Sequence, residues 1–163
     1  YKARLDEVIS ALDNAIHRLW FRNRKVKILF TISPVRYVRD GVVENNLSKA
    51  VLIQAVHHMV NKFDRLYYFP AYELVLDDLR DYRFYKDDLI HPNSQAVQYV
   101  WEKFGNAYFS DETKVFINDN NKIIAALKHK TDDDKNPKYQ EFRNKIDLKI
   151  KEQQKKVKHK IFS

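Results

Sequence analysis

Two short runs of β-branched and aromatic residues, each followed by a proline, constrain the fold most. The first run spans residues 26–32 and is closed by Ser33-Pro34, and the second spans 65–69 and is closed by Pro70. Such runs predict short, mostly buried strands, which a proline then ends because it cannot donate to the ladder. A helical apolar pattern over residues 47–63 separates them and is long enough for a crossover. Strand, crossover helix and strand predict an α/β fold with parallel pairing and right-handed connections.

Helices are predicted around this unit from apolar residues that recur at three- and four-residue steps. The predicted helices span residues 1–24, 47–63, 72–79, 94–109, 111–127 and 139–162. Candidate caps are Asn45, Asn46 or Ser48 for the second helix, Asn93 or Ser94 for the fourth, and Ser110 for the fifth. Residues 36–46 and 80–90 are predicted loops, and residues 130–137, with three consecutive Asp and a Pro, are a predicted solvated linker.

Two strands are too few for a stable parallel sheet with helices on both faces, since an isolated strand pair is marginal at best. We therefore expect the chain to be the C-terminal part of a larger α/β unit. The additional strands would precede Tyr1 or come from another chain.

Composition excludes several classes of site and of protein. The 163 residues, 44% of them hydrophobic, can form a real core. Cysteine is absent, which excludes disulfides, thiolate nucleophiles and cysteine-ligated zinc and fits a cytoplasmic location. Two glycines are too few for a glycine-rich phosphate loop. No apolar run approaches the roughly 20 residues that a membrane span requires, and no signal-peptide pattern is present.

Asp88 and His91, three residues apart just before a predicted helix, are the candidate catalytic pair. The Asp88 carboxylate can accept a hydrogen bond from one imidazole nitrogen and stabilise the imidazolium, which leaves the other nitrogen to take a proton from a nucleophile. The same spacing also occurs in an ordinary surface turn that precedes a helix cap.

Other polar residues have simpler interpretations. Ser33 ends a strand, but Pro34 removes the backbone N–H that an oxyanion hole at a nucleophile elbow would use, so a turn is favoured. His57 and His58 point about 100° apart on a helix and cannot easily share a metal, with His57 expected near the core and His58 in solvent. An acidic cluster could bind a divalent cation, although Arg80 and Arg83 favour ion pairing. It comprises Asp77, Asp78, Asp81, Asp87 and Asp88. We expect no metal and no cofactor.

The basic C-terminal segment carries a rival hypothesis. The net charge is +8, and lysines concentrate in residues 138–160. A basic helix with one apolar stripe can bind nucleic acid, an anionic membrane surface or a partner helix. Acidic interruptions at Glu141, Asp147 and Glu152, together with scarce Arg, favour a solvated helix packed on its own domain.

Four short blocks, in this order, carry a resemblance to a known family. They are Ser33-Pro34-Val35, Asn46-Leu47-Ser48-Lys49-Ala50-Val51-Leu52, Tyr68-Phe69-Pro70-Ala71-Tyr72-Glu73 and Asp88-Leu89-Ile90-His91-Pro92-Asn93. The chain resembles the GSCFA family, a largely bacterial branch of the SGNH (GDSL-like) hydrolases, over roughly residues 26–104. The resemblance implies a three-layer α/β/α fold of flavodoxin-like type, with the site at the carboxyl ends of the strands. Residues 1–110 would be the C-terminal portion of that domain and residues 111–163 a helical, Lys-rich extension.

The resemblance also implies serine esterase or acyl-hydrolase chemistry without a metal, with His91 as base and Asp88 as acid. The substrate would be a small-molecule or glycan ester. The family takes its nucleophilic serine from a Gly-Ser-Cys-Phe-Ala block, and this chain has neither a cysteine nor a Gly-Ser pair. We therefore expect the chain to be inactive alone and to depend on the missing N-terminal part of the same protein. The alternative is a non-catalytic module that binds an anionic partner through its basic C-terminal helix.

Overall fold

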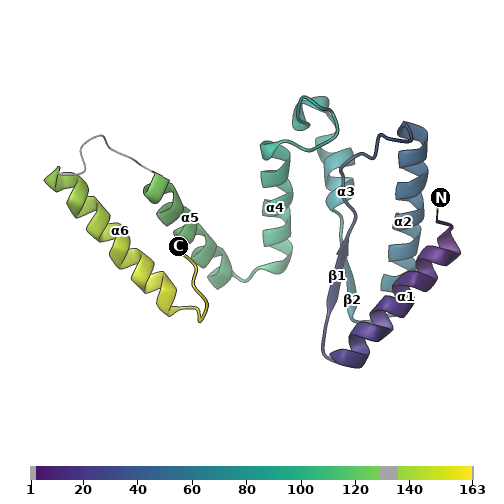
Figure 1. Ribbon diagram of the computed structural model, residues 1–163, viewed down its shortest axis with the longest axis horizontal. Coiled ribbons are helices and arrows are strands. Elements are labelled where there is room, and N and C mark those ends of the chain that lie inside the picture. The colour runs from purple at the N-terminus through teal and green to yellow at the C-terminus, as the bar shows by residue number, and fades with distance from the viewer. Residues whose placement is uncertain (1–2, 129–135, 163) are drawn as a thin grey trace. The chain divides into compact units, whose positions relative to one another are not determined.

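The computed structural model describes residues 3–128 and 136–162 and divides into two compact units, Tyr1–Phe104 and Gly105–Ser163 (Figure 1). The first unit contains a two-stranded sheet in which β1 (Ile28–Thr31) and β2 (Leu66–Phe69) run parallel. Ile28 pairs with Leu66, and the register continues to Thr31 and Phe69. Both predicted strands and their parallel pairing are therefore confirmed.

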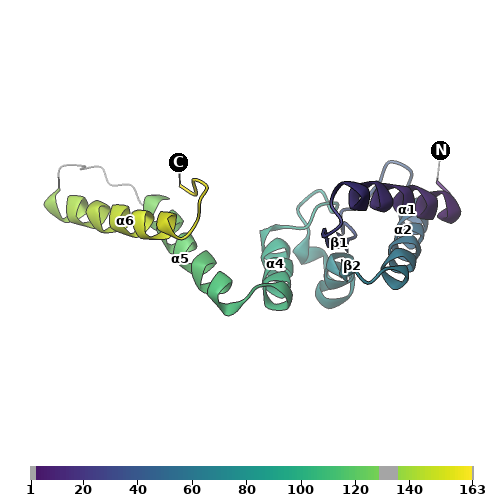
Figure 2. The ribbon, with the colours of Figure 1, turned by 90° about the horizontal axis from the view of Figure 1, so that it is seen from below.

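Two helices pack against one face of this sheet. α1 (Leu5–Arg22) lies beside α2 (Val42–Lys62) in both ribbon views, and α2 is the crossover between the strands (Figures 1 and 2). Ile16 of α1, Met59 of α2 and Leu66 of β2 form the buried centre of this core. Ile28 and Phe30 of β1 pack against it, as do Trp20 of α1 and Phe63, which directly follows α2. The alternation of β1 thus sends its even-numbered side chains into the core.

α2 begins five residues earlier than the sequence predicts, and the predicted caps are wrong. Gly41 occupies the N-cap position with φ of +87°, a left-handed conformation that glycine adopts without steric cost. Asn45 is buried inside the first turns, where its side-chain oxygen accepts a hydrogen bond from the Tyr37 amide at 2.8 Å. This asparagine therefore fixes the preceding loop and does not cap the start of the helix.

The segment after β2 is more irregular than the predicted short helix. α3 (Ala71–Glu73) continues into a π-helical stretch, η1 (Leu74–Leu79), and then into a 3₁₀ turn, η2 (Tyr82–Phe84), inside the predicted loop. α4 (Ser94–Tyr108) follows on the other face of the sheet from α1 and α2 (Figure 1). Its cap is Asn93, whose side-chain oxygen accepts the Ala96 amide at 3.0 Å. One of the two predicted caps is thus confirmed.

The second unit is a helical hairpin of α5 (Asp111–Lys128) and α6 (Pro137–Lys155). Ile123 and Ile146 are buried, and Ser110 caps α5 by accepting the Thr113 amide. α6 ends earlier than predicted because Gln154 binds the following segment, donating to the His159 carbonyl and accepting from the Ile161 amide. Most of the predicted linker, residues 130–137, lies outside the described residues.

Candidate active site

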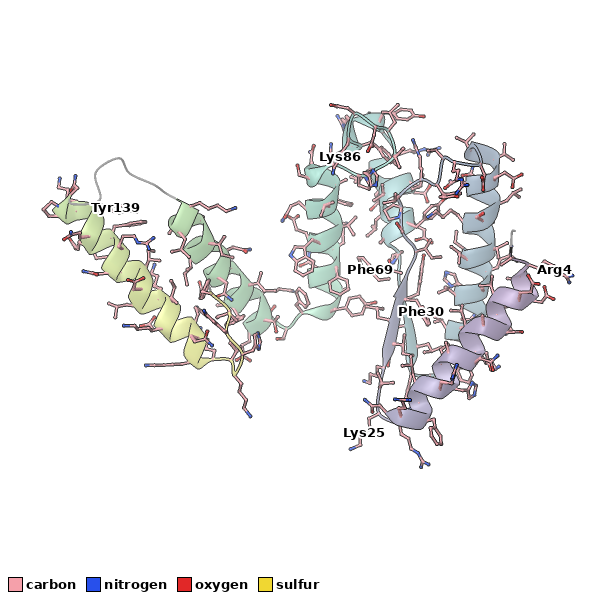
Figure 3. The ribbon with its side chains drawn as sticks, in the orientation of Figure 1. Arg4, Lys25, Phe30, Phe69, Lys86 and Tyr139 are labelled. Atoms are coloured by element: carbon pink, nitrogen blue, oxygen red, sulfur yellow. The ribbon has the colours of Figure 1, made fainter. Side chains whose placement is uncertain are left out.

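The candidate site is a short loop, residues 85–92, closed at its base by an antiparallel bridge between Tyr85 and Pro92. Inside it, the Lys86 amide donates to the His91 carbonyl at 2.8 Å, and the Leu89 amide donates to the Lys86 carbonyl at 2.9 Å. The loop lies beyond the carboxyl ends of the two strands, where Lys86 marks it in Figure 3. This is the edge of an open α/β sheet at which ligands usually bind.

Asp88 binds His91 within this loop, as their spacing allows. One carboxylate oxygen, Oδ2, accepts a hydrogen bond from Nδ1 of His91 at 2.8 Å. The other, Oδ1, accepts the backbone amides of Ile90 and His91 at 2.8 and 2.9 Å. The hydrogen bonds from these two backbone amides, and to a lesser extent the one from the His91 ring, lower the pKa of Asp88 to about 2. A carboxylate held this way stays ionised at neutral pH and favours the imidazole tautomer protonated at Nδ1.

The second ring nitrogen of His91, Nε2, belongs to an exposed side chain. The side chain is 52% exposed, and within the described part of the chain its Nε2 has no hydrogen-bond partner. With Nδ1 protonated, Nε2 carries a lone pair that can accept a proton. The pair therefore has the arrangement of an orienting carboxylate and an available general base.

The other sequence candidates have structural contacts instead. Ser33 Oγ accepts the Val35 amide at 3.2 Å, which makes it part of a turn, as predicted. In the acidic cluster, Asp81 pairs with Arg83 and Asp78 accepts a hydrogen bond from the Tyr99 hydroxyl. Among residues 3–128 and 136–162, no group of three or more potential metal-ligating side chains is found.

The prediction that His57 packs near the core is wrong. Both His57 and His58 are exposed. The His57 ring instead lies against the ring of the half-buried Tyr68, with centroids 4.6 Å apart. The apolar stripe of α2 is centred on Ala55, Val56 and Met59 and not on this histidine.

Sequence reasoning missed Arg36, which contacts the candidate loop from the segment after β1. Its guanidinium donates to the Leu89 carbonyl at 3.0 Å and lies 4.3 Å from the centre of the Tyr85 ring. The available signal was position, because a residue shortly after a parallel strand lies at the edge where such sites form.

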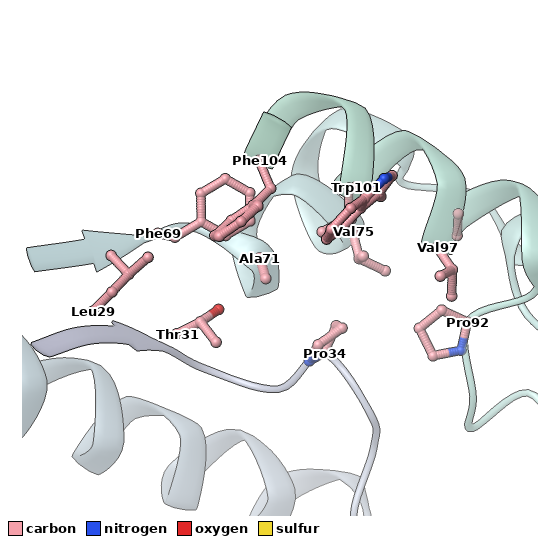
Figure 4. Close-up of a pocket in the computed structure, with 12 residues that line it drawn as sticks. Leu29, Thr31, Pro34, Phe69, Ala71, Val75, Pro92, Val97, Trp101 and Phe104 are labelled. Carbon is pink, nitrogen blue, oxygen red and sulfur yellow. The ribbon is translucent and has the colours of Figure 1, made fainter. Parts of the chain in front are cut away.

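An apolar hollow of about 500 Å³ separates α4 from the sheet (Figure 4). Leu29 and Thr31 of β1 line one side, and Val97, Trp101 and Phe104 of α4 line the other. Pro92, next to His91, lies at one end. Two of the lining α4 residues are substantially exposed, Val97 at 59% and Trp101 at 46%. Apolar surface of this kind is typical of a face that another part of a protein covers.

Comparison with known proteins identifies the family. The model of the GSCFA family matches residues 1–104, which include both strands and the Asp88–His91 loop. The chain belongs to the GSCFA family. The GSCFA match ends before α5 and α6. No curated protein and no solved structure matches the chain. Among the described helices, none is long and apolar enough to cross a membrane.

Proposed function

We propose that this GSCFA chain supplies the general base and its orienting carboxylate to a serine ester hydrolase of the SGNH (GDSL-like) kind. The observation that carries the proposal is the 2.8 Å hydrogen bond between His91 Nδ1 and Asp88 Oδ2, which leaves Nε2 without a partner in the described part of the chain. The pair is exposed and lies at the carboxyl edge of the sheet, where a substrate can reach it.

In the proposed reaction, Nε2 of His91 takes the proton of a serine hydroxyl as that oxygen attacks the ester carbonyl. Asp88 stabilises the imidazolium that forms, and the imidazolium then donates its proton to the departing alkoxide. In the second half, Nε2 takes a proton from the water that attacks the acyl-enzyme. The imidazolium then returns a proton to the serine oxygen as the bond to the acyl group breaks and the acid is released. The substrate class is a small-molecule or glycan ester.

The nucleophilic serine belongs, in this proposal, to a segment of the same protein outside the present sequence. Ser33 is a poor substitute because its Oγ accepts the Val35 amide and Pro34 follows it. The sequence also lacks the Gly-Ser-Cys-Phe-Ala block, so most of the oxyanion hole would come from that segment as well. Without those parts, the chain alone would lose several orders of magnitude in rate.

The free edge of β1 supports the larger flavodoxin-like sheet that this proposal requires. The Ile28 amide donates to the Arg65 carbonyl, on the β2 side. In a parallel pair, alternate residues of one strand direct their amide and carbonyl groups toward the partner strand. Because Ile28 does so toward β2, the backbone groups of Leu29 and Thr31 point away from β2. An added parallel strand would bind these groups and cover the apolar hollow. We propose that the hydrolase domain ends near residue 110 and that residues 111–163 form a helical extension.

The test uses the full-length protein and short-chain p-nitrophenyl esters. We expect the wild type to turn these over, His91→Ala to lose about 10⁴-fold in kcat, and Asp88→Asn to lose about 10²- to 10⁴-fold. His58→Ala, which removes an exposed histidine elsewhere in the first unit, should retain wild-type activity. Equal turnover in all four proteins would end the assignment of this pair as catalytic.

A further inference from the structure

We propose that Arg36 is a positioning residue that holds the 85–92 loop in the shape that places His91 against Asp88. Its effect on turnover rests on the proposed function. Its effect on the loop does not, and can be measured without any substrate.

Arg36 contacts the tip of the loop twice from a position more than fifty residues earlier. Its backbone amide donates to the Ile90 carbonyl at 3.3 Å, and its Nη1 donates to the Leu89 carbonyl at 3.0 Å. These two carbonyls lie between Asp88 and His91 in the sequence. Arg36 therefore fixes the connection between the two members of the candidate pair.

The same guanidinium also contacts the base of the loop. Its central carbon lies 4.3 Å from the centre of the Tyr85 ring and 5.3 Å from that of Tyr82. Tyr85 is 7% exposed and forms the bridge with Pro92 that closes the loop. A guanidinium can donate in its plane while it stacks through its face, which a lysine ammonium cannot do. Arg36 thus joins the base of the loop to its tip.

The tip needs such support because Leu89 has a left-handed backbone, with φ of +56°. This conformation is costly for a residue with a side chain and persists where surrounding contacts hold it. The next two amides, of Ile90 and His91, both donate to Asp88 Oδ1. If Leu89 relaxed to an ordinary conformation, these amides would turn away from the carboxylate and the ring of His91 would lose its fixed position.

The test compares Arg36→Ala and Arg36→Lys with Arg39→Ala in the full-length protein. Arg39 is exposed and lies three residues after Arg36 in the segment that follows β1. Within the described residues it makes no ion pair or ring contact. Hydrogen exchange measured by mass spectrometry should show the 84–93 segment exchanging at least about tenfold faster in both Arg36 variants. The segment of α2 should be unchanged in all three proteins, which separates a local effect from general unfolding.

Kinetics provide the second readout. We expect both Arg36 variants to lose about 10- to 100-fold in kcat with KM changed less than about threefold, because the base is displaced and no substrate contact is removed. Lysine keeps the positive charge, so failure of Arg36→Lys to rescue excludes a purely electrostatic role. Unchanged exchange in the 84–93 segment of both Arg36 variants would overturn the proposal. Altered exchange together with His91-independent turnover would retain the positioning role and refute the catalytic one.

Discussion

Asp88 should remain ionised to unusually low pH. The amides of His91 and Ile90 and the His91 ring hold its pKa at about 2, below the usual value of about 3.9 for an unfolded aspartate. Because the folded pKa is the lower one, this ionisation stabilises the loop fully above pH of about 4, and the contribution is lost as the pH falls toward 2. The carboxyl carbon of Asp88, followed by NMR between pH 1.5 and 6, should report this titration. A midpoint near 4 would contradict the hydrogen bonds described for the loop.

The hydroxyl of Tyr85 should be dispensable. It is buried and, in the part of the chain that the structure describes, has no hydrogen-bond partner. Tyr85→Phe keeps the ring that Arg36 covers and removes the unsatisfied group, so we expect the free energy of unfolding to rise by about 1 kcal/mol. Tyr99→Phe is the matched control, because that hydroxyl donates to Asp78 at 2.9 Å and its loss should destabilise by about 1 kcal/mol. Urea unfolding of both variants measures these changes in the free energy of unfolding, which we expect to be opposite in sign.

Contacts within a few residues could be predicted from the sequence, and distant ones could not. The Asp88–His91 hydrogen bond and the Asn93 cap are local, so spacing alone indicates them. The contact of Arg36 with Leu89 forms only in the folded chain, where the segment after β1 lies beside the 85–92 loop. No periodicity in the chain encodes it. The catalytic role of Asp88 and His91 stays a prediction.

The apolar face of α4 should tolerate charge poorly in the full-length protein. Val97 is 59% exposed here but lines the apolar hollow that we propose an added strand covers. Val97→Asp should therefore destabilise by about 2–3 kcal/mol. Val115 of α5 is the matched control: it is 58% exposed, also near a helix start, and lines no described hollow. We expect Val115→Asp to change stability by less than about 0.5 kcal/mol in chemical denaturation. Equal, small effects would mean that the α4 face is not covered.

Helix and strand positions could be predicted because their apolar patterns repeat, but several ends could not. The start of α2 depends on the left-handed Gly41, and Asn45, one of its three candidate caps, instead accepts a hydrogen bond from the Tyr37 amide. The end of α6 depends on hydrogen bonds of Gln154 to residues five and seven positions later. In each case a side chain forms hydrogen bonds to backbone groups outside the helix. Helix propensity does not predict such contacts.

The two-stranded sheet fits the prediction that these strands belong to a larger one. Its β1 edge directs backbone groups outward, and an apolar hollow lies between the sheet and α4. A sequence pattern can predict the two strands and their parallel direction. The residues of these strands do not specify which further strands complete the sheet. The complete flavodoxin-like sheet therefore stays a proposal about the whole protein.

The net charge of +8, more than any one helix, should set the affinity for polyanions. The α6 lysines are mostly exposed, but acidic residues interrupt them, and the helix packs through Ile146. We expect weak heparin retention at low salt that is lost by about 0.3 M NaCl. The double variant Lys151→Glu/Lys155→Glu in α6 and its matched control, Lys25→Glu/Lys27→Glu before β1, change the charge equally and should lower the eluting salt equally. A markedly larger decrease for the α6 pair would instead identify that helix as a binding surface and favour the interaction-module function.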